Sequence, residues 1–288
     1  MSYNNALYSY SDILNSSSYF YMYDDQLRFS SGVQTMQEKL NHAGFWCDIP
    51  DGIFGGKTDE AVRHFQRAYS LAVDGMAGRN TLSVLDYVSS NSPGFTKTTG
   101  NYGVYFDVYN RRFMYNQQTV YSALNAAGLN KEAIAGFMGN LEAEHQFRTA
   151  LEGTGGAIGL AQWEGDRKTK LYNYANANAR DVTDIILQAW FIIAECSSGS
   201  TYEDTGGAVE CWIKLLSADT VFQAADYVTA LYERCFFVTS WSGIVNSGYE
   251  TNRFDTGSPN ICFSNRYYLD APKRRGYAES YYSCLLQM

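Results

Sequence analysis

The chain has 288 residues, of which 45% are hydrophobic, 16% aromatic and 18% charged. This composition supplies enough apolar surface to offset the entropy lost on folding, and it excludes a disordered protein. The formal net charge of -8 argues against nucleic-acid binding driven by phosphate neutralisation. No apolar run is long enough to insert into a bilayer.

The first part of the chain predicts a lead-in followed by three short helices. Residues 1–26 are rich in Ser, Asn and Tyr, and we expect them to form an irregular or strand-like arm. A helical period of apolar residues then begins at Val33 and ends at Gly44, a residue typical of helix C-termini. Thr58 and Thr81 are predicted to cap the next two helices.

The same sequence motif precedes both of these later helices. Asp-Gly-x-x-Gly-x-x-Thr occurs at 51–58 and again at 74–81. Asp-Gly makes a tight turn because glycine tolerates positive φ, and the second glycine permits close backbone contact. One copy is ordinary turn chemistry, but two copies beside apolar helical runs indicate a repeated structural unit.

Residues 27–90 resemble the three-helix type of peptidoglycan-binding module. The resemblance is carried by the run from Gly32 to Leu40 and by the runs DGxFGxxTxxAVxxFQ and LxVDGxxGxxT. It implies a small α-helical domain that binds cell wall without cutting it. Trp46 and Phe54, near the first turn, either stack on wall sugar or peptide or pack in the core. Residues 91–103 are rich in Ser, Gly and Thr, and we expect them to be a linker.

The second region, residues 104–288, begins with a helix that carries a candidate acid. Asn130 is a predicted N-cap, and apolar residues recur after it at helical spacing. At about 100° per residue, Glu144 lies about 20° from Phe137, whereas Glu142 lies about 140° away. We therefore expect Glu144 to follow the apolar face and Glu142 to point to solvent.

Apolar surroundings favour the protonated form of a carboxyl group, which a general acid needs at neutral pH. The alternative for Glu144 is a helix-end carboxylate that reaches water. Downstream, a glycine-rich loop over 152–159 leads into Gln162 and Trp163. Gln162 offers a donor and an acceptor for an acetamide or hydroxyl group, and Trp163 offers a flat face for a sugar ring.

Together these segments resemble the lysozyme-like domain of phage tail and endolysin proteins, a relative of the lytic transglycosylases and goose-type lysozymes. The motifs are Gly139-Asn140-Leu141-x-x-Glu144 and the run GLAQW over 159–163, with further similarity in helices near 224–234 and 275–281. The resemblance covers about residues 115–285 and implies a mainly α, two-domain protein. It also implies that Glu144 is the catalytic acid.

His145 stands where most relatives have serine. It either tunes Glu144 electrostatically or is a partly exposed spacer. A two-carboxylate glycosidase needs a partner about 5–10 Å from the acid. Glu152 is the preferred candidate and Asp166 the second; if neither reaches, substrate-assisted or transglycosylase chemistry with Glu144 alone remains.

Other wall-active classes lack the necessary residues. A zinc peptidase or amidase needs two or three histidines with a carboxylate. The chain has only His42, His64 and His145, and the first two belong to the module. A cysteine peptidase would depend on His145 as base. The remaining alternative is a wall-anchoring protein whose lysozyme-like domain is inactive. We expect no metal and no cofactor.

The predicted activity is therefore a peptidoglycan glycosidase that cleaves the bond between N-acetylmuramic acid and N-acetylglucosamine. A lytic transglycosylase giving 1,6-anhydro products is the alternative. The partner is bacterial peptidoglycan, and we expect a monomer. The segment Met1 to Tyr23 has no Lys, Arg or apolar core, so we expect no signal peptide. A phage lysin held in the host cytoplasm until release, or a protein secreted by another route, fits this expectation.

Overall fold

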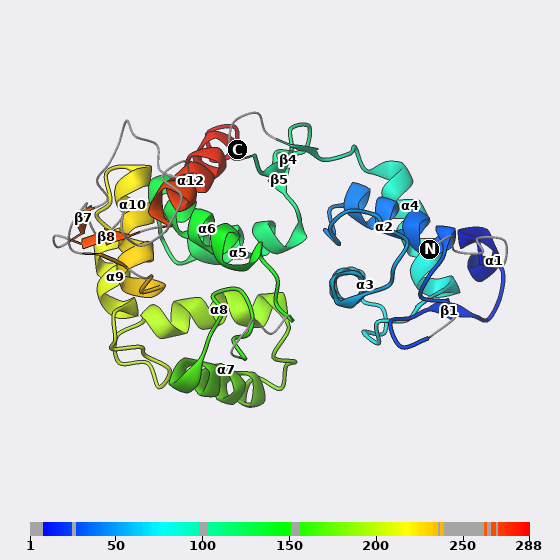
Figure 1. Cartoon of the computed structure of the whole chain (residues 1–288), viewed down its shortest axis with the longest axis horizontal. Coiled ribbons are helices and arrows are strands. Elements are labelled where there is room, and N and C mark those ends of the chain that lie inside the picture. Colours follow the sequence, from blue (N-terminus) through cyan, green and yellow to red (C-terminus); the bar gives the residue numbers. More distant parts are fainter. Residues whose placement is uncertain are drawn as a thin grey trace. The chain divides into compact units, whose positions relative to one another are not determined.

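The computed structural model describes residues 8–24, 27–97, 103–150, 156–235, 237–238, 262–263, 266–268 and 270–288. The fold is mainly α-helical, as predicted, with a few short strands (Figure 1). Contacts divide the chain into two compact units. Unit 1 comprises residues 1–96, 105–116 and 149–151, and unit 2 comprises residues 97–104, 117–148 and 152–288. Among the described residues, no helix has both the length and the apolarity to cross a membrane.

Unit 1 is built around three helices of 13 residues each, α2 (Ser31–Ala43), α3 (Gly56–Ala68) and α4 (Arg79–Asn91). They enclose a core that includes Val33, Leu40, Val62, Phe65 and Leu82. Their amphipathic spacing places one apolar face of each helix toward this core.

The N-terminal segment belongs to the same core. It forms a short helix, α1 (Tyr10–Leu14), and a strand, β1 (Tyr19–Phe20), which pairs antiparallel with β2 (Ala77–Gly78). Tyr10, Ile13 and Phe20 are buried in the core. The strand-like lead-in was expected, whereas the helix and its burial were not visible in the sequence pattern.

Glycine residues lie at three helix ends of unit 1, whereas only one of these was predicted. Gly44 ends α2 at a φ of 95°, as expected. The predicted N-caps Thr58 and Thr81 are wrong, because α3 and α4 begin two residues earlier behind Gly55 and Gly78. Neither glycine has a side chain to cap the helix, so the threonines lie inside the first turn and form other contacts.

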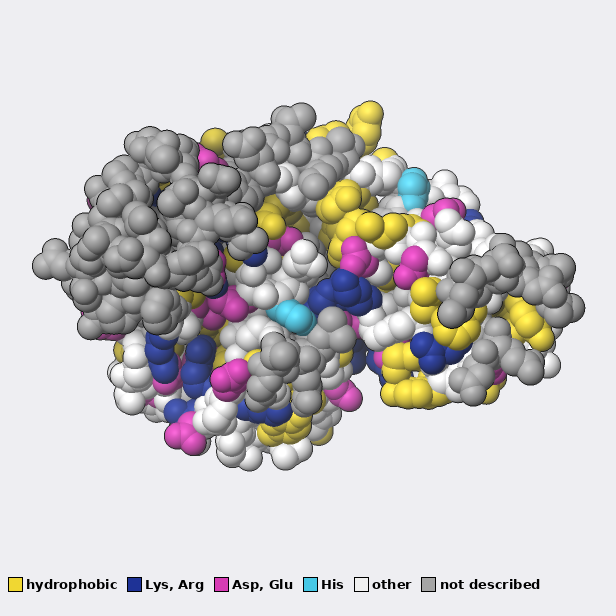
Figure 2. Space-filling model, viewed as in Figure 1, with side chains coloured by type: hydrophobic (Ala, Val, Ile, Leu, Met, Phe, Trp, Pro, Cys, Tyr) yellow, Lys and Arg dark blue, Asp and Glu magenta, His cyan; other side chains and the backbone are white. Residues whose placement is uncertain are grey.

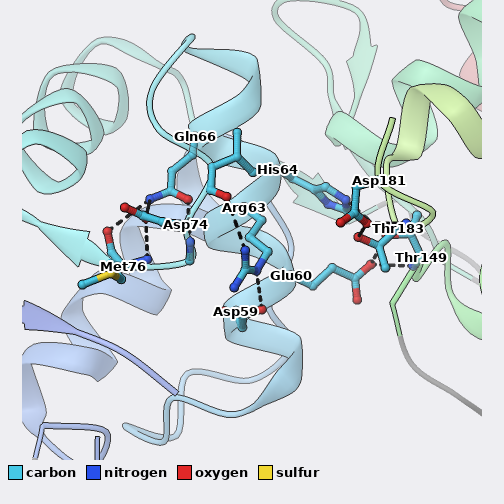
Figure 3. A network of polar contacts seen from close by, with 12 residues as sticks. Asp59, Glu60, Arg63, His64, Gln66, Asp74, Met76, Thr149, Asp181 and Thr183 are labelled. Carbon is cyan, nitrogen blue, oxygen red and sulfur yellow. Dashed lines mark hydrogen bonds and ion pairs between the residues drawn. The ribbon is translucent and has the colours of Figure 1, made fainter. Parts of the chain in front are cut away.

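Each threonine helps to bind a glutamine. Gln66 on α3 donates from Nε2 to Asp74 Oδ1 at 2.8 Å and to Thr81 Oγ1 at 3.3 Å, and its Oε1 accepts from the Gly75 amide at 2.9 Å. Figure 3 shows its side chain turned into the loop that holds Asp74 and Met76. One side chain therefore satisfies the polar groups of a whole turn.

The turn formed by the first copy of the motif, at 51–58, is bound by a glutamine in the same way. Gln37 on α2 donates to Asp51 Oδ1 at 2.9 Å and to Thr58 Oγ1 at 3.0 Å, and it accepts from the Gly52 amide at 2.9 Å. The sequence repeat is thus a repeated glutamine-to-turn contact.

Short strands follow α4. β3 (Thr96–Lys97), within the segment predicted as a linker, forms a three-stranded sheet with β4 (Tyr105–Asp107) and β5 (Arg112–Phe113) in the order β3-β4-β5. β4 and β5 are antiparallel.

Helix α5 (Tyr115–Ala126) begins with the last two residues of a unit 1 segment and belongs to unit 2 from residue 117 onward. The next helices of unit 2 are α6 (Lys131–His145), α7 (Gly165–Ala177), α8 (Ile185–Cys196) and α9 (Ala208–Leu215). They are followed by α10 (Val221–Tyr227), the π-helix η1 (Val228–Tyr232) and α12 (Ala271–Leu285). A small antiparallel sheet has the order β6 (Phe237–Val238), β8 (Arg266–Tyr268), β7 (Cys262–Phe263). Helices α6, α10 and α12 pack against one another (Figure 1).

Two glycines on α6 allow this close packing. A Cβ on Gly136 would lie 2.6 Å from Ala224 Cβ of α10, and one on Gly139 would lie 2.5 Å from the Ala278 amide of α12. Asn140, fully buried between them, donates to Gly136 O and to Ala225 O. The Gly139-Asn140 motif therefore fixes the position of α6, at whose C-terminal end Glu144 lies.

Candidate functional site

Glu144 lies in the last turn of α6, beyond a stretch from Ala133 to Leu141 that is buried throughout. Asn130 caps the start of this helix as predicted, since its Oδ1 accepts from the Ala133 amide at 2.8 Å. The Glu144 side chain is 21% exposed, so its carboxyl group is reachable from solvent while its helix is anchored in the core.

The main polar partner of Glu144 differs from the apolar setting that its helix face predicts. Its Oε1 accepts a hydrogen bond from Nη2 of Arg274 on α12. Arg274 is only 4% exposed and also donates from Nη1 to Asn140 Oδ1 at 3.1 Å. Burial acts to lower the pKa of Arg274, but the negative charges that Cys235 and Glu144 can carry raise it above its usual range. Arg274 therefore keeps its positive charge beside Glu144.

The predicted orientation of Glu142 is wrong. Its Oε2 accepts a hydrogen bond at 2.6 Å from the hydroxyl group of Tyr281, which is fully buried on α12. Burial, followed by the charge of Glu142, raises the pKa of Tyr281 well above its usual value. Glu142 therefore serves the packing of α6 on α12.

The other acidic candidates are not brought to Glu144 by any described contact. Asp166 is exposed in the first turn of α7, where a negative charge suits the positive end of the helix. Glu152 lies outside the described residues. His145 is half-buried at the end of α6, beside Glu144 in the chain.

Gln162 and Trp163 lie in a tight turn closed by backbone hydrogen bonds between Ile158 and Trp163. Gln162 adopts a φ of 46°, and its Nε2 donates to Gly159 O at 3.0 Å. Trp163 is fully buried and packs edge-on against Phe191 with ring centroids 5.3 Å apart. It has no face free to stack on a sugar ring, contrary to the expectation from the sequence.

A buried carboxylate holds this turn. Glu195 on α8 is completely buried and accepts from Trp163 Nε1 and from the Tyr232 hydroxyl group, both at 2.7 Å. Arg167 binds the same carboxylate through Nε at 2.8 Å and Nη2 at 3.0 Å. The sequence analysis does not predict a role for Glu195, although a lone charged residue in the apolar helix 185–196 indicates a buried carboxylate with a polar partner.

Glu233 is a second carboxyl group that the sequence reasoning did not select. It directly follows η1, and its amide donates to Val228 O at 2.9 Å. Burial raises its pKa well above the usual value for glutamate, and the negative charge of Glu144 adds to the increase while Arg274 opposes it. The protonated form of Glu233 is therefore favoured.

In unit 1, the two aromatic candidates differ. Phe54 is fully buried in the core. It therefore packs in the core, as one of the two predicted alternatives has it, and it cannot stack on a wall sugar or peptide. Trp46 is half-buried and tilts against Tyr105 with ring centroids 4.5 Å apart. His64 and Glu60 are buried, and both contact Thr149, a residue grouped with this unit (Figure 3).

Unit 1 also contains a cavity of about 280 Å³. It lies between the N-terminal segment and the second turn of the repeat. Its lining includes Ser16, Ser18, Tyr19, Arg79 and Asn80. This lining is about equally polar and apolar, and it combines hydroxyl groups, two amides, the Arg79 guanidinium group and the carboxyl group of Asp74.

The described residues contain no group of three or more His, Cys, Asp or Glu side chains arranged to hold a metal ion. Burial raises the pKa of Cys235 and of Cys284 to about 12, and it raises those of Cys196 and Cys211 well above the usual value. These thiols are poor nucleophiles at neutral pH because the thiolate is the reactive form. Figure 2 shows acidic and basic side chains intermixed on the face in view.

Comparison with known proteins agrees with this architecture. Residues 115–239 match the family model of the phage tail lysozyme, and residues 30–85 match that of the peptidoglycan binding domain. N-acetylmuramoyl-L-alanine amidase CwlM of Mycobacterium tuberculosis is 39% identical over 66 residues, which are 23% of this chain and 16% of that protein.

Two further relatives are spore cortex-lytic enzymes. That of Bacillus cereus is 37% identical over 76 residues, covering 25% of this chain and 29% of the enzyme. That of Oceanobacillus iheyensis is 30% identical over 93 residues, covering 31% and 34%. The chain thus spans between 16% and 34% of the length of these curated relatives.

Proposed function

The chain carries a lysozyme-like domain behind an N-terminal peptidoglycan-binding module, and from this premise we propose that it degrades bacterial cell wall. Residues 27–90 bind the wall, and residues 104–288 cleave its glycan strand. The bond cut joins N-acetylmuramic acid to N-acetylglucosamine, and Glu144 is the general acid.

The observation that carries the proposal is the setting of Glu144. It is the acidic residue that follows the buried Gly139-Asn140 packing motif, and its carboxyl group is partly exposed. Arg274 binds one carboxyl oxygen, which restricts the rotation of the side chain. A carboxyl group that is rigidly held yet accessible meets the geometric demand on a general acid.

In the proposed step, Glu144 transfers its proton to the oxygen of the glycosidic bond. The bond to the departing sugar breaks, that sugar leaves as an alcohol, and the remaining ring passes through an oxocarbenium-like state. Water can then add to this ring, lose a proton to the Glu144 carboxylate and give a reducing sugar. Alternatively, the ring's own hydroxyl group adds, loses its proton to the same carboxylate and gives a 1,6-anhydro product, which requires no second carboxylate acting on water.

For the module, the cavity beside the second turn is the proposed wall-binding position. Arg79 donates from Nε to Leu14 O at 3.2 Å, which holds its guanidinium group at the edge of the cavity. A guanidinium group there suits the carboxylates of wall peptides, and the serine hydroxyl groups and Asn80 suit their amides. The ligand class is therefore a peptide-bearing fragment of peptidoglycan.

The decisive experiment is mass spectrometry of fragments released from purified cell walls by wild type and by Glu144→Gln. We expect wild type to release glycan fragments and the variant to release almost none. A hydrolase product carries one added water that a 1,6-anhydro product lacks, so the same spectra separate the two chemistries. Undiminished release by the variant overturns the assignment of Glu144. Wall binding without release by wild type favours an inactive anchoring protein, and release of free peptides indicates an amidase.

We further propose that the protein acts as a monomer and belongs to a phage or prophage. It would stay in the host cytoplasm until a membrane lesion gives it access to the wall.

A further inference from the structure

The side chains of β1 and of the residues after it alternate between core and solvent. Phe20 is fully buried in the core of unit 1, and Met22 packs against that core. The residues at 19, 21 and 23 are all tyrosines. Because successive side chains of extended backbone point to opposite sides, the three tyrosines share the outward side. We call Tyr19, Tyr21 and Tyr23 the tyrosine strip.

Contacts between the rings show that the tyrosine strip is one continuous row. The ring centroids of Tyr19 and Tyr21 are 6.2 Å apart and those of Tyr21 and Tyr23 are 5.3 Å apart, and both pairs meet edge-to-face. This geometry is favoured for aromatic pairs, so each ring fixes the orientation of its neighbour. Tyr23 is 70% exposed and Tyr19 is 37% exposed, so the row is open to solvent.

The backbone beneath the strip is held in place by the core. β1 pairs with β2, and the Phe20 ring lies directly over Gly32, where a Cβ would be 2.5 Å from Phe20 Cζ. The exposed rings therefore stand on a segment that is fixed before any ligand arrives. Such preorganisation lowers the entropy cost of binding.

The chemistry of the strip suits a neutral ligand that carries hydroxyl groups. No residue from Asn15 to Tyr23 is charged, and this segment contains three serines and three tyrosines. An uncharged surface offers no electrostatic attraction to nucleic acid or to an anionic membrane. The face of a tyrosine ring instead favours the C–H groups of a sugar ring, and the hydroxyl groups can bond to those of the sugar.

The strip begins at the cavity that we propose for wall peptides. Tyr19 lines this cavity together with Arg79 of the second turn. In peptidoglycan the peptides branch from the glycan strand, so a fragment whose peptide occupies the cavity has its sugar rings close by. The strip precedes residues 30–85, which match the model of the peptidoglycan binding domain, so that match does not imply a role for it.

We propose that the tyrosine strip binds the glycan strand of peptidoglycan by stacking on its sugar rings. This rests on the proposed wall binding by unit 1, and it adds a sugar site to the peptide site at the cavity. The strip holds the glycan, and no bond is made or broken there.

The test needs a reporter at the strip itself, because the lysozyme-like domain also binds glycan if the proposed function is right. Tyrosine-ring NMR signals of the full chain are followed while the tetramer of N-acetylglucosamine is added, in Glu144→Gln so that the probe stays intact. The signals of Tyr21 and Tyr23 should shift until they saturate. Those of Tyr87 should not shift, since it is equally exposed, at 72%, on α4 but lies outside the cavity lining. Unmoved strip signals, or equal shifts at Tyr87, overturn the proposal.

Matched substitutions then measure what one ring contributes. Tyr23→Ser should weaken the affinity reported by Tyr21 about 2- to 10-fold, the size expected for one aromatic contact. Tyr23→Phe keeps the ring and should stay close to wild type, and Tyr87→Ser should change nothing. Equal losses in Tyr23→Ser and Tyr87→Ser would contradict binding at the strip. A loss in Tyr23→Phe as large as that in Tyr23→Ser would contradict stacking.

A peptide probe separates the strip from the cavity. Trialanine has amide and carboxylate groups but no sugar ring, and it should leave the signals of Tyr21 and Tyr23 unchanged. Shifts with trialanine that equal or exceed those with the sugar would assign the strip to wall peptides and overturn the proposal. If the strip binds the sugar while wild type releases no glycan fragments from walls, the sugar site stands and only the proposed cleavage fails.

Discussion

The indole Nε1 of Trp163 donates to Oε2 of Glu195 across 2.7 Å, and both side chains are completely buried. The contact joins the turn over 158–163 to helix α8. Gln188, two turns earlier on the same face of α8, supports the same turn by accepting from the Leu160 amide at 3.0 Å. The position of Gln162 therefore depends on two polar side chains of a mostly apolar helix.

We predict that Glu195→Gln lowers the free energy of unfolding by about 3–5 kcal/mol, because the largely buried Arg167 loses its principal counter-ion. Urea denaturation at pH 7 measures the change. The control is Glu210→Gln, which removes an exposed partner 3.8 Å from Lys214 and should have little effect. Similar losses in the two variants would contradict the importance of the buried network.

The repeated turns of unit 1 lead to a local prediction. Gln37→Ala should increase amide hydrogen exchange in residues 51–58 and leave residues 74–81 unchanged, because each glutamine satisfies the polar groups of one turn. Gln66→Ala should give the reverse pattern. Each variant thus controls for the other, and Gln34→Ala, an exposed position on α2, should change neither turn. Equal changes in both turns would mean that the glutamines act on the module as a whole.

The repeat also shows how far sequence reasoning reaches in this protein. The two Asp-Gly phrases predict both turns and the helices that follow them. They do not reveal the partners, since Gln37 lies 14 residues before its turn and Gln66 lies 8 residues before its own. A contact at variable separation leaves no periodic signal, and for this reason Thr58 and Thr81 resemble helix caps in the sequence.

At the candidate site, periodicity orients α6 but says nothing about what packs on it. Arg274 is 130 residues from Glu144, and Glu233 follows a π-helix whose phase differs from that of an α-helix. Trp163 illustrates the opposite error. A tryptophan after a glycine-rich loop resembles an exposed platform, whereas the buried Glu195 makes a core position favourable for its N–H group.

Wall binding by unit 1 should depend on the cavity beside the second turn. We predict that Arg79→Ala weakens co-sedimentation of the full chain with purified cell walls, because the cavity loses its cation for wall carboxylates. Arg111→Ala removes the same charge from an exposed position outside the cavity lining and should bind like wild type. If both variants lose affinity equally, general electrostatic attraction explains binding, and the cavity does not.

Arg274 and Arg275 are adjacent on α12 and allow a matched test of how Glu144 is held. Arg274 reaches Glu144 and Asn140 at once, whereas Arg275 binds Asp226 through Nε at 2.9 Å and Nη2 at 2.6 Å. A lysine ammonium group cannot reproduce the two separate directions of a guanidinium group. Arg274→Lys should therefore leave the charge in place but let the carboxyl group of Glu144 shift.

A small displacement of a general acid costs up to about 100-fold in rate. We expect Arg274→Lys to lower kcat for wall cleavage by about 10- to 100-fold with little change in KM, because substrate binding does not depend on this contact. Arg275→Lys makes the same chemical change at the Asp226 contact and should keep kcat close to wild type. Both constants come from the rate of fragment release at increasing wall concentration. Equal losses in the two variants would assign the effect to the packing of α12, and a change in KM alone would place Arg274 among the residues that bind the glycan.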